Sequence, residues 1–176
     1  MITDDGTILR THALGESGLI VVWSTYEHGV MRTAARGALR PGGAFSGRLD
    51  LFHACELEWT PPRRGNLCAL TGVRLKSPRL NLRKDLSALR LAGYMVQLLV
   101  GTVEQRTPIP EFHVLLERAL DYLDAHGASL RLMTHFEKRL AEKHGVLAPG
   151  RNPADCLEGC FGRLPSGRDA LMRLLS

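Results

Sequence analysis

The 176-residue sequence lacks the features that define several special classes of protein. A chain of this length buries about two thirds of its unfolded surface, so the fold needs no disulfide framework. The four cysteines are therefore expected to be free thiols, with Cys55 and Cys68 buried in strands. The most hydrophobic stretch, residues 86–103, is interrupted by Arg90 and Gln97 and is too polar for a membrane span. Residues 1–10 have no apolar core of a signal peptide, so we expect a cytoplasmic protein.

The motifs of common catalytic sites are also missing. The sequence has no phosphate-binding glycine-lysine loop, no dinucleotide fingerprint, no nucleophile elbow and no histidine pair at metalloprotease spacing. We therefore expect no enzymatic activity and no cofactor. Cys156 and Cys160 form the one metal-like pair, with His144 as a conceivable third ligand. A structural zinc site needs four ligands, so we expect no zinc.

The charge of the chain is unevenly distributed. The whole chain carries +5, whereas residues 30–84 hold eleven basic and three acidic side chains, a net charge of +8. A solvated basic face kept for solubility is one interpretation. Nine of the eleven basic residues are arginines, whose forked guanidinium groups suit phosphate oxygens, and this favours a nucleic acid. The candidate nucleic-acid contacts are Arg32, Arg36, Arg40, Arg48, Arg63, Arg64, Arg74 and Lys76, with Phe45 and Trp59 as exposed platforms for base stacking.

The N-terminal part of the sequence is patterned as short strands. Runs of strand-forming residues are separated by turns rich in glycine and proline, and they cover residues 7–12, 19–23, 30–36, 51–59 and 67–75. Alternation in the third run places Arg32 and Arg36 on one face. Five short strands are typical of an OB-fold barrel, and an SH3-like barrel has a similar strand count, so the pattern leaves both open.

The period of the hydrophobic residues changes after Pro78. Three- and four-residue steps predict helices over residues 86–104, 110–126 and 129–144, and a short one over 168–175. Short connections between them indicate a compact bundle. The prediction is an α+β protein with an OB-fold DNA-binding domain (1–80), an α-helical domain (81–148) and a Gly/Pro-rich loop with a short C-terminal helix (149–176).

Several strings in this order resemble the RecO family of bacterial recombination mediators. In the barrel region they are residues 15–21 (GESGLIV), 27–29 (EHG), 34–40 (AARGALR) and 47–52 (GRLDLF). In the helical region they are residues 81–85, Arg131, 135–140 (HFEKRL) and 144–145. Family members with two cysteine pairs continue into a further helical segment, so this chain is expected to be a short, C-terminally reduced member without zinc.

The resemblance implies a DNA repair function. RecO proteins bind single- and double-stranded DNA, anneal complementary strands and help to load recombinase onto DNA coated by single-stranded DNA-binding protein. They work with RecR and, in many bacteria, with RecF, and such a protein would be associated with the nucleoid. By position, Arg36, Arg40 and Arg48 match basic sites of the family where DNA contact is expected.

A second site follows from the same resemblance. The helical region where the family receives the acidic, apolar C-terminal tail of the single-strand-binding protein matches Arg131, Phe136, Arg139 and Leu140, although Phe136 and Leu140 could simply be core. Two other functions remain open from the sequence: a protein–protein adaptor acting through the helical bundle, and an RNA-binding OB-fold module.

Overall fold

A computed structural model describes all residues, 1–176, and the chain divides into two compact units. The barrel unit comprises Met1–Pro78 together with Gln105–His113, and the helical unit comprises Arg79–Glu104 together with Val114–Ser176. The sequence division had placed residues 105–113 in the helical domain. No helix of either unit is long and apolar enough to cross a membrane.

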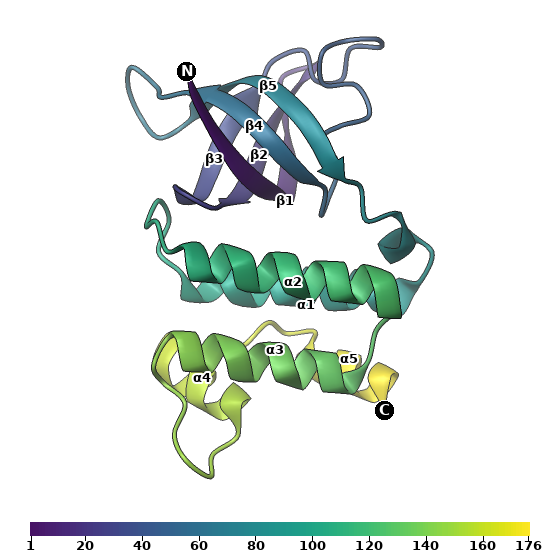
Figure 1. The fold of residues 1–176 in the computed structure, drawn as a ribbon, viewed down its shortest axis with the longest axis vertical. Helices are drawn as coiled ribbons and strands as arrows, with labels where there is room; N and C mark the ends of the chain where they lie inside the picture. Colours follow the sequence, from purple (N-terminus) through teal and green to yellow (C-terminus); the bar gives the residue numbers. More distant parts are fainter. The chain divides into compact units, whose positions relative to one another are not determined.

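The barrel unit is a closed five-stranded barrel (Figure 1). Its strands are β1 (Ile2–Leu14), β2 (Gly18–Thr25), β3 (Gly29–Ala35), β4 (Ala54–Thr60) and β5 (Cys68–Ser77). The order around the barrel is β1-β2-β3-β5-β4, and β4 returns to pair with β1. The long first strand pairs with β4 through its first half and with β2 through its second half. This order confirms the predicted OB-fold and removes the SH3-like alternative.

One hydrophobic cluster fills the barrel. Trp23, Leu57 and Ile8 are fully buried in it, and the Trp23 indole N–H donates to the Thr33 hydroxyl oxygen at 2.8 Å. The cluster also contains Cys55 and Cys68, which form no disulfide, so the prediction of two buried strand cysteines is confirmed. Thr33 is itself buried in the core, whereas Arg10 and Arg32 of the same wall are exposed on the outer surface.

The barrel closes through a short seam between β3 and β5. Only two positions pair there, in parallel: Thr33 with Cys68 and Ala34 with Ala69. Earlier along β3, residues 105–113, here called the return segment, take the place of β5. Gln105 bridges to Val30, and the Arg106 backbone N–H donates to the Val30 carbonyl oxygen at 3.0 Å. The Arg106 guanidinium also donates to the Cys68 sulfur at 3.2 Å.

The helical unit contains a short 3-10 helix, four complete α-helices and all of α2 except its first four residues, which belong to the barrel unit. Their bounds are η1 (Leu80–Arg83), α1 (Leu86–Thr102), α2 (Pro110–His126), α3 (Leu130–Lys143), α4 (Pro153–Phe161) and α5 (Arg168–Leu175). The Asp85 carboxylate caps α1 by accepting the backbone N–H groups of Ser87 and Ala88, and the Ser129 hydroxyl caps α3. The helices α1, α2, α3 and α5 lie close to their predicted positions.

Residues 149–176 are more ordered than predicted. A loop was expected before the last helix, but Pro153–Phe161 form α4, which packs on α3. Proline at the first helical position and the Asn152 side chain, which accepts the Ala154 N–H, start this helix. The segment was predicted as a loop because it is rich in glycine and proline, and these two features of a helix N-terminus were overlooked.

A buried polar cluster attaches the last helix to the helical unit. The Glu137 carboxylate is buried, accepts the Tyr94 hydroxyl at 2.5 Å, and accepts two hydrogen bonds from Arg168 of α5 at 2.7 and 3.0 Å. Burial and the negative charge of Glu137 raise the pKa of Tyr94, which stays a hydrogen-bond donor. A buried carboxylate is tolerated only when it is paired in this way.

Gly29 allows the return segment to approach the barrel. Its φ is +67°, and a Cβ atom on it would lie 2.2 Å from the Thr107 carbonyl oxygen. Gly15 has a similar φ of +61° with no heavy atom within 4 Å of the same position. We predict that Gly15→Ala lowers the free energy of unfolding by about 1 kcal/mol, the cost of left-handed backbone. Gly29→Ala should cost clearly more, because it also displaces the return segment.

Urea denaturation followed by tryptophan fluorescence measures this difference, because both tryptophans lie in the barrel core. Equal losses for the two variants would show that the return segment does not stabilise the barrel.

Candidate nucleic-acid interface and helical groove

The outer surface of β1, β2 and β3 carries a row of unpaired arginines. Arg10 of β1 is opposite Val22 of β2, and Val22 is opposite Arg32 of β3. Neighbouring strands are about 4.8 Å apart, so the backbones of the two arginines are about 10 Å apart on one face. Arg36 follows at the end of β3, and all three arginines are exposed without an acidic partner. The predicted basic face of β3 is therefore present and extends to β1.

Sequence alternation missed Arg10. Strict alternation puts Ile8 and Arg10 on the same face, and Ile8 is a core residue. The pairing of β1 with β2 shifts between Ile8 and Arg10, which leaves Leu9 without an opposite residue. This bulge turns Arg10 to the outside, and only the strand register reveals it.

The turn between β4 and β5, residues 61–67, adds two more cations. Since Cys68 pairs in parallel with Thr33, the residue before Cys68 enters the barrel beside Arg32. Arg63 and Arg64 in this turn are exposed and have no acidic partner. In OB-folds, the face of strands 2 and 3 and the loop between strands 4 and 5 bind oligonucleotides. These arginines occupy the corresponding places.

Three other predicted contacts are engaged within the protein. Arg74 forms a two-point pair with Glu56 at 2.9 and 3.0 Å, and this hydrogen bonding lowers the pKa of the Glu56 carboxyl. Lys76 pairs with Asp5. Arg48 donates to the Val73 carbonyl oxygen at 3.1 Å. Arg40, in contrast, is exposed without an acidic partner in the loop after β3.

Phe45 and Trp59 are not the exposed platforms that the sequence analysis expected. Phe45 is 8% exposed and Trp59 is 4% exposed, and both belong to the core of the barrel. The glycine-rich loop around Phe45 folds through successive tight turns, with the Ser46 N–H donating to Gly43 and the Arg48 N–H to Phe45. These turns carry the phenyl ring inward.

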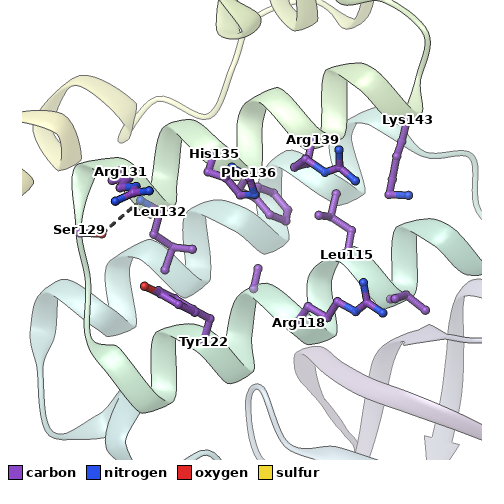
Figure 2. Close-up of a pocket in the computed structure, with 12 residues that line it drawn as sticks. Leu115, Arg118, Tyr122, Ser129, Arg131, Leu132, His135, Phe136, Arg139 and Lys143 are labelled. Carbon is purple, nitrogen blue, oxygen red and sulfur yellow. Dashed lines mark hydrogen bonds between the residues drawn. The ribbon is translucent and has the colours of Figure 1, made fainter.

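A groove of about 650 Å³ runs between α2 and α3 of the helical unit (Figure 2). Its floor is apolar, with Leu115 on α2 and Leu132 and Phe136 on α3. Cations and polar groups surround the floor. Figure 2 shows Arg118, Arg139 and Lys143 toward one end and Tyr122, Ser129 and Arg131 toward the other, with His135 between them.

The predicted partner site falls on this groove in part. Arg131, Phe136 and Arg139 line it, whereas Leu140 is fully buried and does not. Phe136 is 1% exposed, so it is a core residue whose ring also forms the groove floor. Arg139 is paired with Glu142 at 2.7 Å, an exposed pair that a ligand can displace at small cost.

The α2 side of the groove, including Arg118 and Tyr122, was missed by sequence reasoning. A helix pattern identifies an apolar stripe but does not identify the neighbouring helix that faces it.

Both members of the cysteine pair lie on α4. Cys156 is buried in α4, Cys160 is exposed, and no group of three or more His, Cys, Asp or Glu side chains is arranged to hold a metal ion.

Comparison with known proteins assigns the chain to a family. Residues 1–79 match the sequence model described as recombination protein O N terminal. The chain is 31% identical over 162 residues to DNA repair protein RecO of Myxococcus xanthus, covering 92% of this chain and 66% of that protein. RecO of Geobacter sulfurreducens is 32% identical over 136 residues, with 77% and 55% covered. RecO of Cutibacterium acnes is 37% identical over 122 residues, with 68% and 49% covered.

The fold and the two surfaces define an OB-fold protein with an additional helical unit. The matches to known proteins extend from the barrel into the helical unit. They show that the chain belongs to the RecO family. It spans about half to two thirds of the length of these relatives.

The burial of Phe45 in the barrel core can be tested by measuring stability. Phe45→Ala should lower the free energy of unfolding of the barrel by about 3 kcal/mol, the usual effect of removing a buried phenyl ring. Leu39→Ala, in the same loop, removes a side chain of a residue that is 55% exposed and should change it by less than about 0.5 kcal/mol. Urea denaturation of both variants measures this, and an undiminished stability of Phe45→Ala would restore the exposed-platform prediction.

Proposed function

We propose that this chain is a DNA-binding recombination mediator that acts in DNA repair. The observation that carries the proposal is the row of arginines without acidic partners on the outer face of β1, β2 and β3, formed by Arg10, Arg32 and Arg36 and flanked by Arg63 and Arg64. The family of the chain supports the same function, since its relatives are named DNA repair proteins.

Contacts from this face would be made mainly to phosphates. Guanidinium groups bind phosphate oxygens regardless of sequence, so both single- and double-stranded DNA are proposed ligands with little sequence preference. Binding of this kind weakens steeply with salt because each contact releases counterions.

The same face offers a physical basis for strand annealing. On the strands, the positions of this face between Arg10 and Arg36, apart from Arg32, are His12, Ile20, Val22 and Ala34, and none of them is a tryptophan, tyrosine or phenylalanine. A surface that holds the backbone of a single strand without stacking its bases leaves the base edges free. Two strands held in this way can pair, and we propose annealing as part of the function.

The helical groove is proposed to bind the acidic C-terminal tail of single-stranded DNA-binding protein. An apolar floor formed by Leu115, Leu132 and Phe136 suits an apolar terminal residue. The surrounding cations, Arg118, Arg131, Arg139 and Lys143, suit acidic side chains and a terminal carboxylate. Through this tail the protein would be recruited to coated DNA, where it helps to load recombinase together with RecR and, in some bacteria, RecF.

The DNA-binding proposal predicts a difference between two pairs of cations on the barrel. Arg32→Ala with Arg36→Ala should reduce the dependence of binding on salt, lowering the slope of log K against log salt by about 1.4 for single-stranded DNA. Arg74→Ala with Lys76→Ala removes the same charge but affects cations already paired with Glu56 and Asp5. This control pair should lower the slope much less.

Fluorescence anisotropy with labelled DNA over a series of salt concentrations measures both slopes. Equal changes for the two pairs would mean that the barrel attracts DNA by net charge without a defined site. Matched RNA and DNA oligonucleotides test the alternative of an RNA-binding module, which a preference for RNA would favour.

The groove proposal predicts loss of peptide binding. Arg131→Glu with Lys143→Glu should weaken binding of an acidic peptide with an apolar C-terminal residue at least about tenfold, because two cations become repulsive. Lys138→Glu is the control, since Lys138 is exposed on α3 but does not line the groove. Isothermal titration calorimetry measures both. Tight peptide binding by a protein whose barrel binds no DNA would favour the adaptor alternative.

A further inference from the structure

Two aromatic rings lie stacked and exposed at the end of α2. The ring centroids of Tyr122 and His126 are 4.1 Å apart with an angle of 19° between the ring planes, and Tyr122 is 51% exposed. His126 Nδ1 lies 3.0 Å from the Tyr122 carbonyl oxygen, so this nitrogen carries the hydrogen and the imidazole is held over the phenol. The helix ends at His126, and Gly127, with φ +80°, turns the chain away. The ring pair is therefore fixed in place before any ligand binds.

Two sides of α2 differ in their side chains, one acidic and the other with a cation and two rings. The acidic side chains Glu117, Asp121 and Asp124 form one stripe, and it is neutralised within the helical unit. Arg79 pairs with Glu117 at 3.0 Å and with Asp121 at 2.8 Å. The Asp124 carboxylate accepts the backbone N–H groups of residues 81 and 82.

The other stripe contains the ring pair. Arg118, Tyr122 and His126 follow one another at four-residue steps, so they lie along one side of the helix. Arg118 and Tyr122 line the groove, and Arg131 of α3 lies at the Tyr122 end of the groove (Figure 2). Neither arginine has an acidic partner. The rings are thus accompanied by cations that are available to an anionic ligand.

We infer that the Tyr122–His126 pair is a stacking platform for one base of single-stranded DNA, with Arg118 and Arg131 contacting the adjacent phosphates. Bases stack on exposed aromatic side chains whatever their sequence, and cations beside the rings hold the backbone. This inference rests on the proposed function, that the chain binds DNA, and adds a contact in the helical unit that the outer face of the barrel does not provide.

A planar base fits this position better than a peptide side chain does. The groove already offers a peptide an apolar floor of Leu115, Leu132 and Phe136. The ring pair offers flat, exposed aromatic faces, which favour another flat ring. On the outer face of the barrel a strand is held by its phosphates alone, so one stacked base would distinguish single-stranded from double-stranded DNA.

The test compares two labelled oligonucleotides of equal length in the full chain, one of thymidines and one with abasic sites at most positions. Both carry the same phosphates. Tyr122→Ala should weaken binding of the thymidine oligonucleotide at least about fivefold and leave the abasic one unchanged. Tyr122→Phe should keep the affinity, because it keeps the ring. Tyr26→Ala is the matched control, since Tyr26 is 45% exposed in the barrel unit and contacts His113 by its edge.

Other results would overturn the inference. Equal weakening for the two oligonucleotides would show that Tyr122 does not stack on a base. Weaker binding of the acidic peptide with unchanged DNA binding would assign the ring to the peptide. If Arg32→Ala with Arg36→Ala lowers the salt dependence while Tyr122→Ala behaves as wild type, the platform is wrong and the proposed function stands. If the wild-type chain binds neither oligonucleotide, both are wrong.

Discussion

Closure of the barrel depends on the short seam between β3 and β5. Two paired positions are few for joining strands that otherwise pair over six to eight residues, and an open edge would leave backbone groups of β3 unsatisfied. The return segment satisfies one of those groups, since the Arg106 backbone N–H donates to the Val30 carbonyl oxygen, and the Arg106 guanidinium donates to the Cys68 sulfur on β5.

The same closure sets the chemistry of the outer surface. With every strand paired on both sides, β2 and β3 form a continuous wall, and the long charged side chains of these strands lie outside it, while Thr33 is buried with a hydrogen-bond partner. Arg32 lies on β3 at the level of the seam, with the turn of Arg63 and Arg64 on one side and the β2 and β1 strands on the other. The cationic surface is thus a consequence of barrel register. The helical unit also has an arginine without an acidic partner, but for a different reason. Arg79 binds the acidic side chains of α2, Glu117 and Asp121, so neither of them pairs with Arg118.

Much of the architecture could be predicted from the sequence, because strands and helices have different hydrophobic periods. The ranges of β2, β3 and α1 to α3 were recovered from that period alone, and α5 was predicted at its observed bounds. Features that depend on pairing or packing were not recoverable. Arg10 was missed because a bulge reverses the alternation of β1, and Phe45 was placed outside because loop composition does not reveal where a turn directs a ring. The α2 side of the groove could be seen only from the packing of two helices. Residues 105–109 of the return segment have no periodic pattern that would place them beside β3.

Because of the return segment, the barrel unit of the structure and the part of the chain that matches the family model have different boundaries. The match to the family model covers residues 1–79 and so ends just after the fifth strand. The physical barrel includes residues that the chain supplies only after α1 has been completed. During translation all five strands therefore emerge before the segment that packs against the start of β3. A barrel cut at residue 79 would lack the backbone hydrogen bond from Arg106 to Val30 and the contact of Arg106 with the Cys68 sulfur.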